Sequence, residues 1–461
     1  MKRLAACSTA TGCAGLLAGI RRKAPAFETS AAPVTTFFVA LAALAALTAV
    51  PTAAQVAVRA GTLHTVSGPP IENAVVIAGA DGKIEWVGPA ADANIPDGIE
   101  VVEAAVVTPG LVDPHSVVGL SGALNSNVGP VRDQDQLERS SPIQPDLRAI
   151  DAYDANETLV EWVRSYGVTT MHTGHGPGAL VSGQTMIAKT RGRNVDQAVV
   201  VPARMLASTL GNAVSSNFQS PGTSAKGIAM LRNALFGAQA YLDQVQQAAE
   251  AGTEDGDEAE GDEADGEEGD AKPAPKAPAR DLSKEALGQV LEGELSLLIT
   301  ANTVPEIASA LRLQQEFGFD LVLDGAAESY LLLDEIREAG VPVLLHPTMS
   351  RVRNGSYETA ASLADAGIPF AIQTGFEGYV PKTRVLLWEA AIAAANGLGM
   401  ERALEAVTLS PARILGIDDR VGSIEVGKDA DLALFDGDPF EYTSHICGVI
   451  IESEVMSTEC R

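Results

Sequence analysis

Histidine is the residue type whose placement here most directly suggests chemistry, because a neutral imidazole binds metal ions and transfers protons near neutral pH. The sequence contains six histidines: His64, His115, His172, His175, His346 and His445. Four of them stand at the ends of apolar runs that we expect to be strands: His115, His172, His175 and His346. Side chains at the ends of neighbouring parallel strands gather on one face, so these four are candidate metal ligands.

A mononuclear metal site is the first hypothesis for these residues. It would use His115, His346 and one or both of His172 and His175. Three neutral imidazoles and a water suit Zn²⁺. The alternative is that the histidines only hydrogen-bond among loops and bind no metal.

Three further residues lie close to predicted strand ends and extend the candidate site. Lys189 can add a ligand, whereas Asp324 and Glu377 are the candidate proton acceptors. Lys189 can equally be a solvated lysine at the end of a strand. These residues therefore extend the candidate site, whose proton acceptor has two alternatives.

The elements that must position these residues alternate between strand and helix, as a parallel barrel requires. After the strand ending at His115, we expect strands at Val168–His172, Thr185–Lys189, Ala198–Met205, Ser296–Thr300, Leu321–Asp324, Val343–His346 and Phe370–Gln373. We expect helices at Asn156–Tyr166, Ala225–Ala248, Ser283–Leu291, Val304–Phe317, Ser329–Ala339, Tyr357–Ala366 and Arg384–Asn396. The fold class is α/β, with a (β/α)8 TIM-like barrel over residues 108–417.

Short β-rich runs flank this region on both sides. They are Val56–Thr65, Ala74–Ala78, Ile84–Val87 and Glu100–Val107 before it, and Ala430–Phe435 and Val449–Glu452 after it. The Asp81-Gly82 step suits a hairpin turn. We expect residues 55–107 and 418–461 to form one small composite β-sandwich, into which the barrel is inserted.

Two motifs make the chain resemble a known family. The segment TPGLVDPHS (Thr108–Ser116) is similar to the first-strand motif of metal-dependent hydrolases, and Thr408–Glu441 closely resembles the C-terminal signature of the amidohydrolase superfamily, in its imidazolonepropionase-like branch. The resemblance covers roughly residues 55–461, apart from the acidic insertion. It implies a TIM-like barrel, a divalent metal and hydrolysis of a C–N bond by a metal-activated water.

Several residues depart from the pattern that this resemblance implies. Val117 stands where the second histidine of the first-strand motif is expected, and Gly375 stands where the proton-shuttling aspartate is expected. Thr300 with Asn302, and Asp324 with Gly325, replace two further histidines, whereas Lys189 has a plausible position for the bridging lysine. We therefore do not expect a conventional binuclear centre.

Composition and charge restrict the partners. The net charge is −28, which disfavours nucleic-acid binding because that needs clustered Lys and Arg. Residues 249–280 are acidic and then Pro-rich, and we expect them to be a disordered insertion. The expected partner is a small-molecule substrate, and an oligomer is possible.

The N-terminus has the pattern of a secretory signal. The apolar run Phe37–Val50 follows basic residues and precedes small ones, so we expect residues 1–54 to be removed and the protein to be periplasmic or secreted, without a stable membrane span in the mature chain. An uncleaved interfacial anchor is the alternative. Cys447 and Cys460 then remain, either as one disulfide or as two free thiols.

Two functions from different classes follow. The first is an exported amidohydrolase-like hydrolase that cleaves a non-peptide or small-peptide C–N bond. The second is a catalytically silent barrel that binds a ligand or a partner protein, since fold alone does not determine function.

Overall fold

The computed structural model describes residues 56–124, 134–257, 277–345, 353–375 and 385–460, and of residues 252–257 only the backbone. The described residues belong to one compact unit. Several predictions lie outside them: the signal peptide at 1–54, His346, Glu377 and residues 258–276 of the acidic segment.

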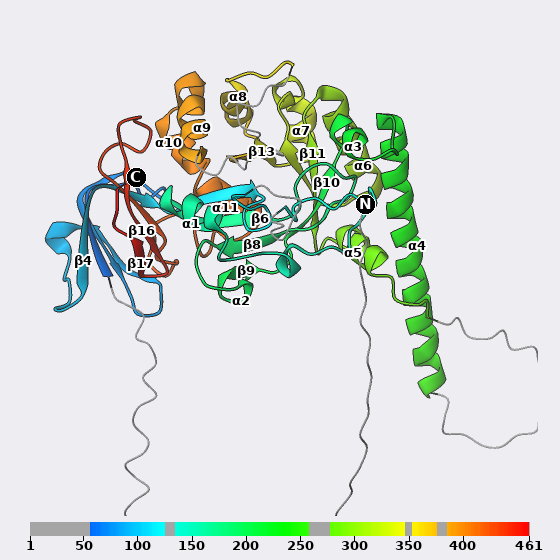
Figure 1. The fold of residues 1–461 in the computed structure, drawn as a ribbon, viewed down its shortest axis with the longest axis horizontal. Helices are drawn as coiled ribbons and strands as arrows, with labels where there is room; N and C mark the ends of the chain where they lie inside the picture. The colour runs from blue at the N-terminus through cyan, green and yellow to red at the C-terminus, as the bar shows by residue number, and fades with distance from the viewer. Residues whose placement is uncertain (1–55, 125–133, 258–276, 346–352, 376–384, 461) are drawn as a thin grey trace, which may run out of the picture. The chain divides into compact units, whose positions relative to one another are not determined.

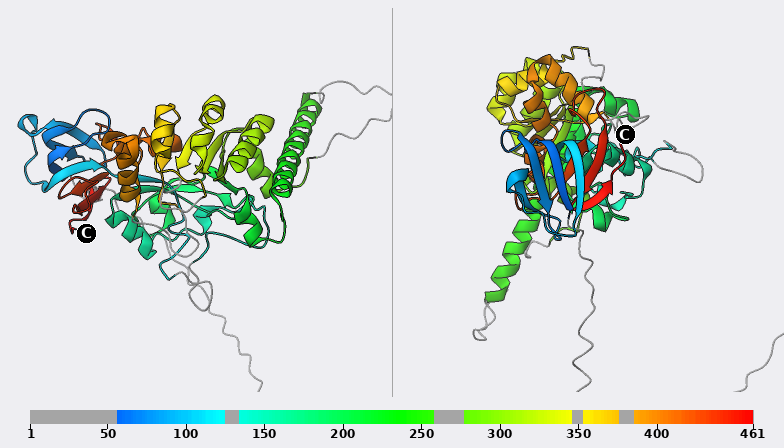
Figure 2. Two further views of the ribbon diagram at one scale, coloured as in Figure 1. Left: turned by 90° about the horizontal axis from the view of Figure 1, so that it is seen from above. Right: turned by 90° about the vertical axis from the view of Figure 1, so that its left-hand side faces the viewer.

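Both ends of the chain contribute to one seven-stranded sheet, seen in the right-hand view of Figure 2 as neighbouring blue and red strands. Its order is β17-β16-β15-β4-β1-β2-β3. The strands are β1 (Val56–Leu63), β2 (Ile71–Ala78), β3 (Ile84–Pro89), β4 (Glu100–Pro109), β15 (Leu432–Phe435), β16 (Ile446–Ile451) and β17 (Glu454–Ser457). β4 joins the two ends, because it pairs with both β1 and β15. The two-sheet sandwich stays a prediction.

Alternation of side chains explains why β1 forms part of this sheet. Val56, Val58 and Ala60 pack in one apolar cluster, whereas Ala57 packs with Val75 in another. Successive side chains of a strand point to opposite faces, so both faces of the sheet bury apolar groups near β1. The predicted hairpin is present, with Gly82 at a φ of 83° between β2 and β3.

The middle of the chain contains two further sheets (Figure 1). One has the order β5-β6-β8-β9 and the other β14-β13-β12-β11-β10-β7. Their strands are β5 (Leu111–Ser116), β6 (Val168–Thr173), β7 (Gly183–Gln184), β8 (Met186–Lys189), β9 (Val199–Val201), β10 (Met205–Thr209), β11 (Ser296–Ala301), β12 (Leu321–Gly325), β13 (Val343–Leu345) and β14 (Phe370–Ile372).

These two sheets share one apolar core. Seven strands each contribute a buried residue to it: Val112, Ile187, Met205, Leu298, Val322, Leu344 and Ala371. The strands from β10 to β14 are parallel to one another. The fold is therefore mixed α/β, and a closed eight-stranded barrel stays a prediction.

Two of the predicted middle strands differ from the structure. β8 lies antiparallel to β6 rather than parallel to it. The predicted strand Ala198–Met205 is instead β9 followed by β10, because Pro202 has no N–H with which to continue a ladder. The alternation of one strand with one helix is therefore interrupted between β6 and β10.

The helices follow the predicted pattern more closely. They are α1 (Thr158–Ser165), α2 (Val195–Ala198), α3 (Asn212–Asn217), α4 (Ser224–Asp257), α5 (Leu282–Leu291), α6 (Val304–Phe317), α7 (Leu333–Ala339), α8 (Thr359–Asp365), α9 (Leu386–Ala393), α10 (Met400–Glu405) and α11 (Leu409–Leu415). α6 has the predicted bounds because local signals set both ends: Glu306 accepts the N–H of Thr303, and Gly318 ends the helix at a φ of 75°.

α4 is longer than predicted. It continues past Ala248 to Asp257, so the first residues of the predicted disordered insertion are helical. In the part of the chain that the structure describes, no helix combines the length and apolarity needed to span a bilayer.

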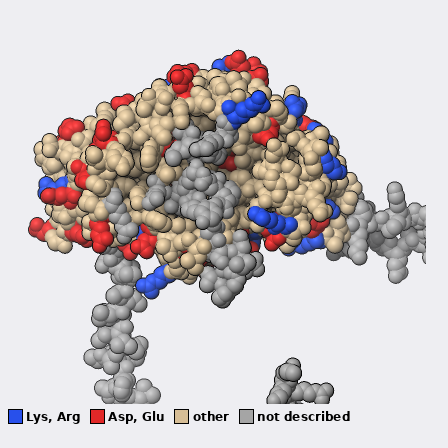
Figure 3. All heavy atoms as spheres, turned by 45° about the horizontal axis from the view of Figure 1, so that its top comes forward, with Lys and Arg blue, Asp and Glu red and all other residues tan. Residues whose placement is uncertain are grey.

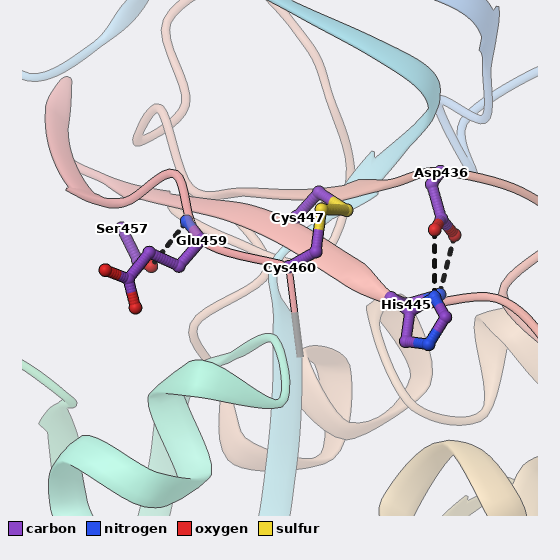
Figure 4. Close-up of a disulfide and its surroundings, with 6 residues drawn as sticks. All are labelled: Asp436, His445, Cys447, Ser457, Glu459 and Cys460. Atoms are coloured by element: carbon purple, nitrogen blue, oxygen red, sulfur yellow. Dashed lines mark hydrogen bonds and ion pairs between the residues drawn. A yellow bond between two sulfur atoms is a disulfide. The ribbon is translucent and has the colours of Figure 1, made fainter.

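The C-terminal cysteines are bonded to each other. Figure 4 shows the disulfide between Cys447 on β16 and Cys460, just beyond β17. This decides between the two alternatives that the sequence left open for this pair.

Candidate functional site

A buried histidine–aspartate pair lies between the two central sheets. His115 from β5 and Asp324 from β12 are 209 residues apart, yet their Nδ1 and Oδ1 atoms are 2.8 Å apart. Both side chains are more than nine-tenths buried. A carboxylate accepts only, so Nδ1 of His115 donates the hydrogen bond.

Asp324 is also held by a residue of β11 and by the residue that follows β14. Thr300 of β11 contacts its Oδ2 at 2.6 Å, and Gln373, directly after β14, donates to its Oδ1 at 2.7 Å. Both carboxylate oxygens are therefore engaged by protein groups, which fixes the orientation of the acid and, through it, of the imidazole.

The second nitrogen of His115 is free. Its Nε2 is buried and has no hydrogen-bond partner among the described residues. His115 lines a cavity of about 330 Å³ together with Asp324, Thr300 and Gln373. Because Nδ1 carries the proton shared with Asp324, a neutral His115 has its lone pair on Nε2, where it can accept a proton or bind a metal.

Electrostatics strengthen this pair. Burial opposes protonation of His115, but the charge of Asp324 and its hydrogen bond outweigh burial and raise the pKa above 6.5. Burial would raise the pKa of Asp324, yet the charge of His115 and the hydrogen bonds from His115, Thr300 and Gln373 lower it to about 2. Asp324 therefore remains ionised, and His115 is a stronger base than an isolated histidine.

A second acid lies beside the pair. Asp113 is two residues before His115, and burial raises its pKa to about 6 although Thr374 hydrogen-bonds to it. Sequence reasoning overlooked Asp113, although alternation along β5 places it on the same face as His115. Gln373 and Thr374 were also overlooked, and their signal was only their position at the end of a predicted strand.

His172 has both ring nitrogens engaged. Its Nδ1 donates to the Pro114 carbonyl at 2.7 Å, and its Nε2 accepts from the Thr185 hydroxyl at 2.6 Å. Burial, aided by the charge of His115, lowers its pKa to about 3. The rings of His172 and His115 lie 6.0 Å apart. His172 is therefore a neutral neighbour of the pair, and neither of its nitrogens is free to bind a metal or a substrate.

His175 is buried in the loop after β6. No described residue bonds to either ring nitrogen, and burial lowers its pKa to about 4. It is absent from the lining of the His115 cavity among the described residues. The structure thus does not bring His175 to the same cavity as His115.

Lys189 lies elsewhere, because β8 runs opposite to β6. Register pairs Lys189 with Thr170, whereas the strand end that carries His172 and Thr173 pairs with Ile187 and Met186. The Lys189 ammonium is buried and contacts Asp431 at 2.6 Å and Asp429 at 3.0 Å. Lys189 therefore links β8 to the C-terminal motif and does not reach the cavity.

The described residues do not by themselves form a metal centre. Over the described ranges, no group of three or more His, Cys, Asp or Glu side chains is placed to hold an ion. His115 offers one free nitrogen, and the carboxylate behind it is the arrangement that orients metal-bound histidines. His346 lies outside the described residues, so the predicted ligand set stays untested.

Comparisons with known proteins all find similarity to amidohydrolases. Residues 322–458 match the model of the Amidohydrolase family. An imidazolonepropionase from Thermoplasma acidophilum is 30% identical over 125 residues, which cover 27% of this chain and only 30% of that protein. An imidazolonepropionase from Solibacter usitatus is 24% identical over 431 residues, covering 84% of this chain and 93% of that protein. The crystal structure of an amidohydrolase from Thermotoga maritima has a TM-score of 0.77 at 25% identity, covering 88% of this chain and all of that one.

Proposed function

Because the chain belongs to the amidohydrolase superfamily, in its imidazolonepropionase-like branch, we propose that it hydrolyses a C–N bond of a small molecule in the His115 cavity. The bond is that of a non-peptide amide or of a small peptide. The observation that carries this proposal is the unpartnered Nε2 of His115, a side chain that Asp324 orients and that lines the cavity.

In this proposal His115 is the general base and, later, the general acid. Nε2 takes a proton from a water as the water oxygen attacks the carbonyl carbon. The same proton then passes to the nitrogen that leaves as the C–N bond breaks. Asp324 keeps Nδ1 protonated and stabilises the imidazolium that forms, as a carboxylate does in a catalytic triad.

The superfamily generally uses divalent metals, and Zn²⁺ at His115, His346 and one or both of His172 and His175 remains our sequence-based prediction. The described residues do not complete such a site, and His172 would first have to lose two hydrogen bonds. We assign the proton transfer to His115, whose Nε2 has no partner among the described residues.

The proposal extends to the fold. The shared core of the two central sheets supports a (β/α)8 barrel over residues 108–417. The pairing of β4 with β15 supports its insertion between two halves of one β-domain, residues 55–107 and 418–461. A disulfide between Cys447 and Cys460 is expected of an exported protein, so it supports a periplasmic or secreted location.

A silent binding protein is the second candidate. The observation that favours it is the saturation of polar groups near the cavity: both oxygens of Asp324 and both nitrogens of His172 already have protein partners. Such a barrel would bind a ligand at His115 without turning it over.

Replacing His115 separates the two candidates. We expect His115→Gln and Asp324→Asn to lower kcat for an amide substrate by a factor on the order of 10² to 10⁴, since that is what general acid–base catalysis supplies. Asp135→Asn, which lies outside the cavity lining, is the control. Equal rates for wild type and His115→Gln on every amide that the protein cleaves would contradict the proposal.

Metal analysis of the same proteins tests the role of His115. About one zinc per chain, lost in both His115→Ala and His346→Ala, would show that Nε2 is a ligand rather than the base. A metal-free wild type with turnover would support the proton-transfer role.

A further inference from the structure

The cavity at His115 carries negative but no positive charge along its described walls. Asp324 and Glu306 both line it, and no described lining residue is Lys or Arg. Both oxygens of Asp324 already accept hydrogen bonds, from His115, Thr300 and Gln373. Glu306 is therefore the carboxylate that a bound molecule would meet.

Glu306 has one oxygen in use and one free. It stands at the third position of α6, where Oε2 accepts the N–H groups of Asn302 and Thr303, both at 3.0 Å. No described residue donates to Oε1. Gly211 leaves room for this oxygen, because a Cβ at Gly211 would lie 1.8 Å from it.

Two more acceptors at this cavity lack donors. Asn302 Oδ1 is buried without a partner among the described residues, and so is His115 Nε2. Both residues line the cavity together with Glu306. Three acceptors without donors, one of them charged, favour a ligand that brings N–H groups and a positive charge.

A second cavity lies next to the first and shares three of its walls. Leu210, Asn212 and Glu306 line both cavities. The second cavity has a volume of about 100 Å³, and its apolar walls include Leu180, Val214 and Ile228. It is suited to a small aliphatic group attached to the molecule whose cation contacts Glu306.

We propose that the site selects amides that carry a protonated primary amine and an aliphatic side chain. The ammonium group binds between Glu306 and Asn302, and the side chain enters the second cavity. An anionic substrate is disfavoured by the charge of Glu306. The identity of the cleaved bond rests on the proposed function, whereas the preference for an amine does not.

Binding of three small ligands with one carbon skeleton tests this preference without turnover. We would measure 3-methylbutylamine, 3-methylbutan-1-ol and 3-methylbutanoate by calorimetry on the full-length protein. We expect the amine to bind about tenfold tighter than the alcohol, as one charge-assisted hydrogen bond allows, and the carboxylate weakest. Equal affinity for amine and alcohol would overturn the proposal.

Glu306→Gln is the decisive variant. Glutamine keeps an acceptor for the N–H groups of Asn302 and Thr303, so α6 stays capped while the charge is lost. We expect the affinity for the amine to fall about tenfold, to that of the alcohol, with the alcohol unchanged. Glu316→Gln makes the same change on the same helix, where Glu316 pairs with Arg232 on the surface, and should alter neither affinity. An amine preference that survives Glu306→Gln would refute the assignment.

Turnover of matched amides keeps the two proposals distinguishable. L-leucinamide and 4-methylpentanamide differ only in the amine, and L-leucinamide and glycinamide only in the side chain. We expect L-leucinamide to be the best substrate of the three in kcat/KM. Failure to cleave any amide, with the amine preference intact in binding, would contradict the proposed function and leave the charge selection standing.

Discussion

In the proposed mechanism, one nitrogen of His115 carries out the proton transfer. Its Nδ1 is bonded to an acid that is itself bonded to Thr300 and Gln373, so only Nε2 is left for a substrate or a metal. His172, from the same candidate set, is neutral and fully bonded. Histidines that look equivalent in sequence are thus distinguished by the partners they acquire.

Asp113 gives a prediction at this scale. Burial raises its pKa from 3.8 to about 6, so its contribution to stability is present below pH 3.8 and is lost as pH rises through about 6. Asp113→Asn removes this loss. Between pH 4 and pH 7 the free energy of unfolding of Asp113→Asn should rise relative to that of wild type by about 2 kcal/mol.

Urea unfolding of both proteins at pH 4, 5, 6 and 7 would check the Asp113 prediction. Asp97→Asn, on an exposed loop, provides the comparison. A constant difference between wild type and Asp113→Asn across this range would show that Asp113 ionises normally in the fold.

At the scale of elements, the reversal of β8 explains the place of Lys189. The antiparallel register carries its ammonium away from the cavity and into contact with Asp429 and Asp431. Asp429 also pairs with Lys83 and Arg420. These five residues tie the four-stranded sheet to the loop before β15, and hence to the sheet that both chain ends form.

Lys189→Met tests this ionic cluster. The substitution removes the buried ammonium group that pairs with the carboxylates of Asp429 and Asp431. We expect a loss of about 3–5 kcal/mol of stability. Lys83→Met removes a cation from the same cluster, but the Lys83 side chain is 37% exposed, so the loss should be at most about 1 kcal/mol. Chemical denaturation measures both. Similar losses in the two variants would argue against the buried role of Lys189.

At the scale of the whole molecule, acidic residues exceed basic ones by 28. The face shown in Figure 3 carries both kinds, interspersed on the surface. With Glu306 and Asp324 at the cavity, this excess should draw cationic rather than anionic molecules toward the protein. The disulfide between Cys447 and Cys460 adds a covalent closure at the end of the same chain.

The disulfide gives a prediction for the intact protein. Closing a loop of about this size contributes roughly 3 kcal/mol, and the loop contains the part of β16 that follows Cys447, the turn after it and β17. In Cys460→Ser we expect faster hydrogen exchange in β17, whereas β10 to β14 and the activity remain unchanged. Slowly exchanging β17 amides in this variant would show that pairing with β16 suffices without the bond.

The sequence by itself determined the elements whose signals are local. Glu306 and Gly318 bound α6 through hydrogen bonds and a φ angle that involve only near neighbours. The two family motifs, Thr108–Ser116 and Thr408–Glu441, already indicated the superfamily that the comparisons support, and His115 was already a candidate. Local signals also predicted the apolar strands, because the pattern of apolar residues that is typical of a strand lies within a few consecutive residues.

Only the tertiary structure decided which of the candidates act together. Asp324 reaches His115 across 209 residues, and the direction of β8 removes Lys189 from the cavity. The sequence offered Asp324 and Glu377 as candidate bases, and the structure shows Asp324 as the hydrogen-bond partner that orients His115. Strand direction and long-range contacts depend on the packing of the whole core, and no window of consecutive residues contains that information.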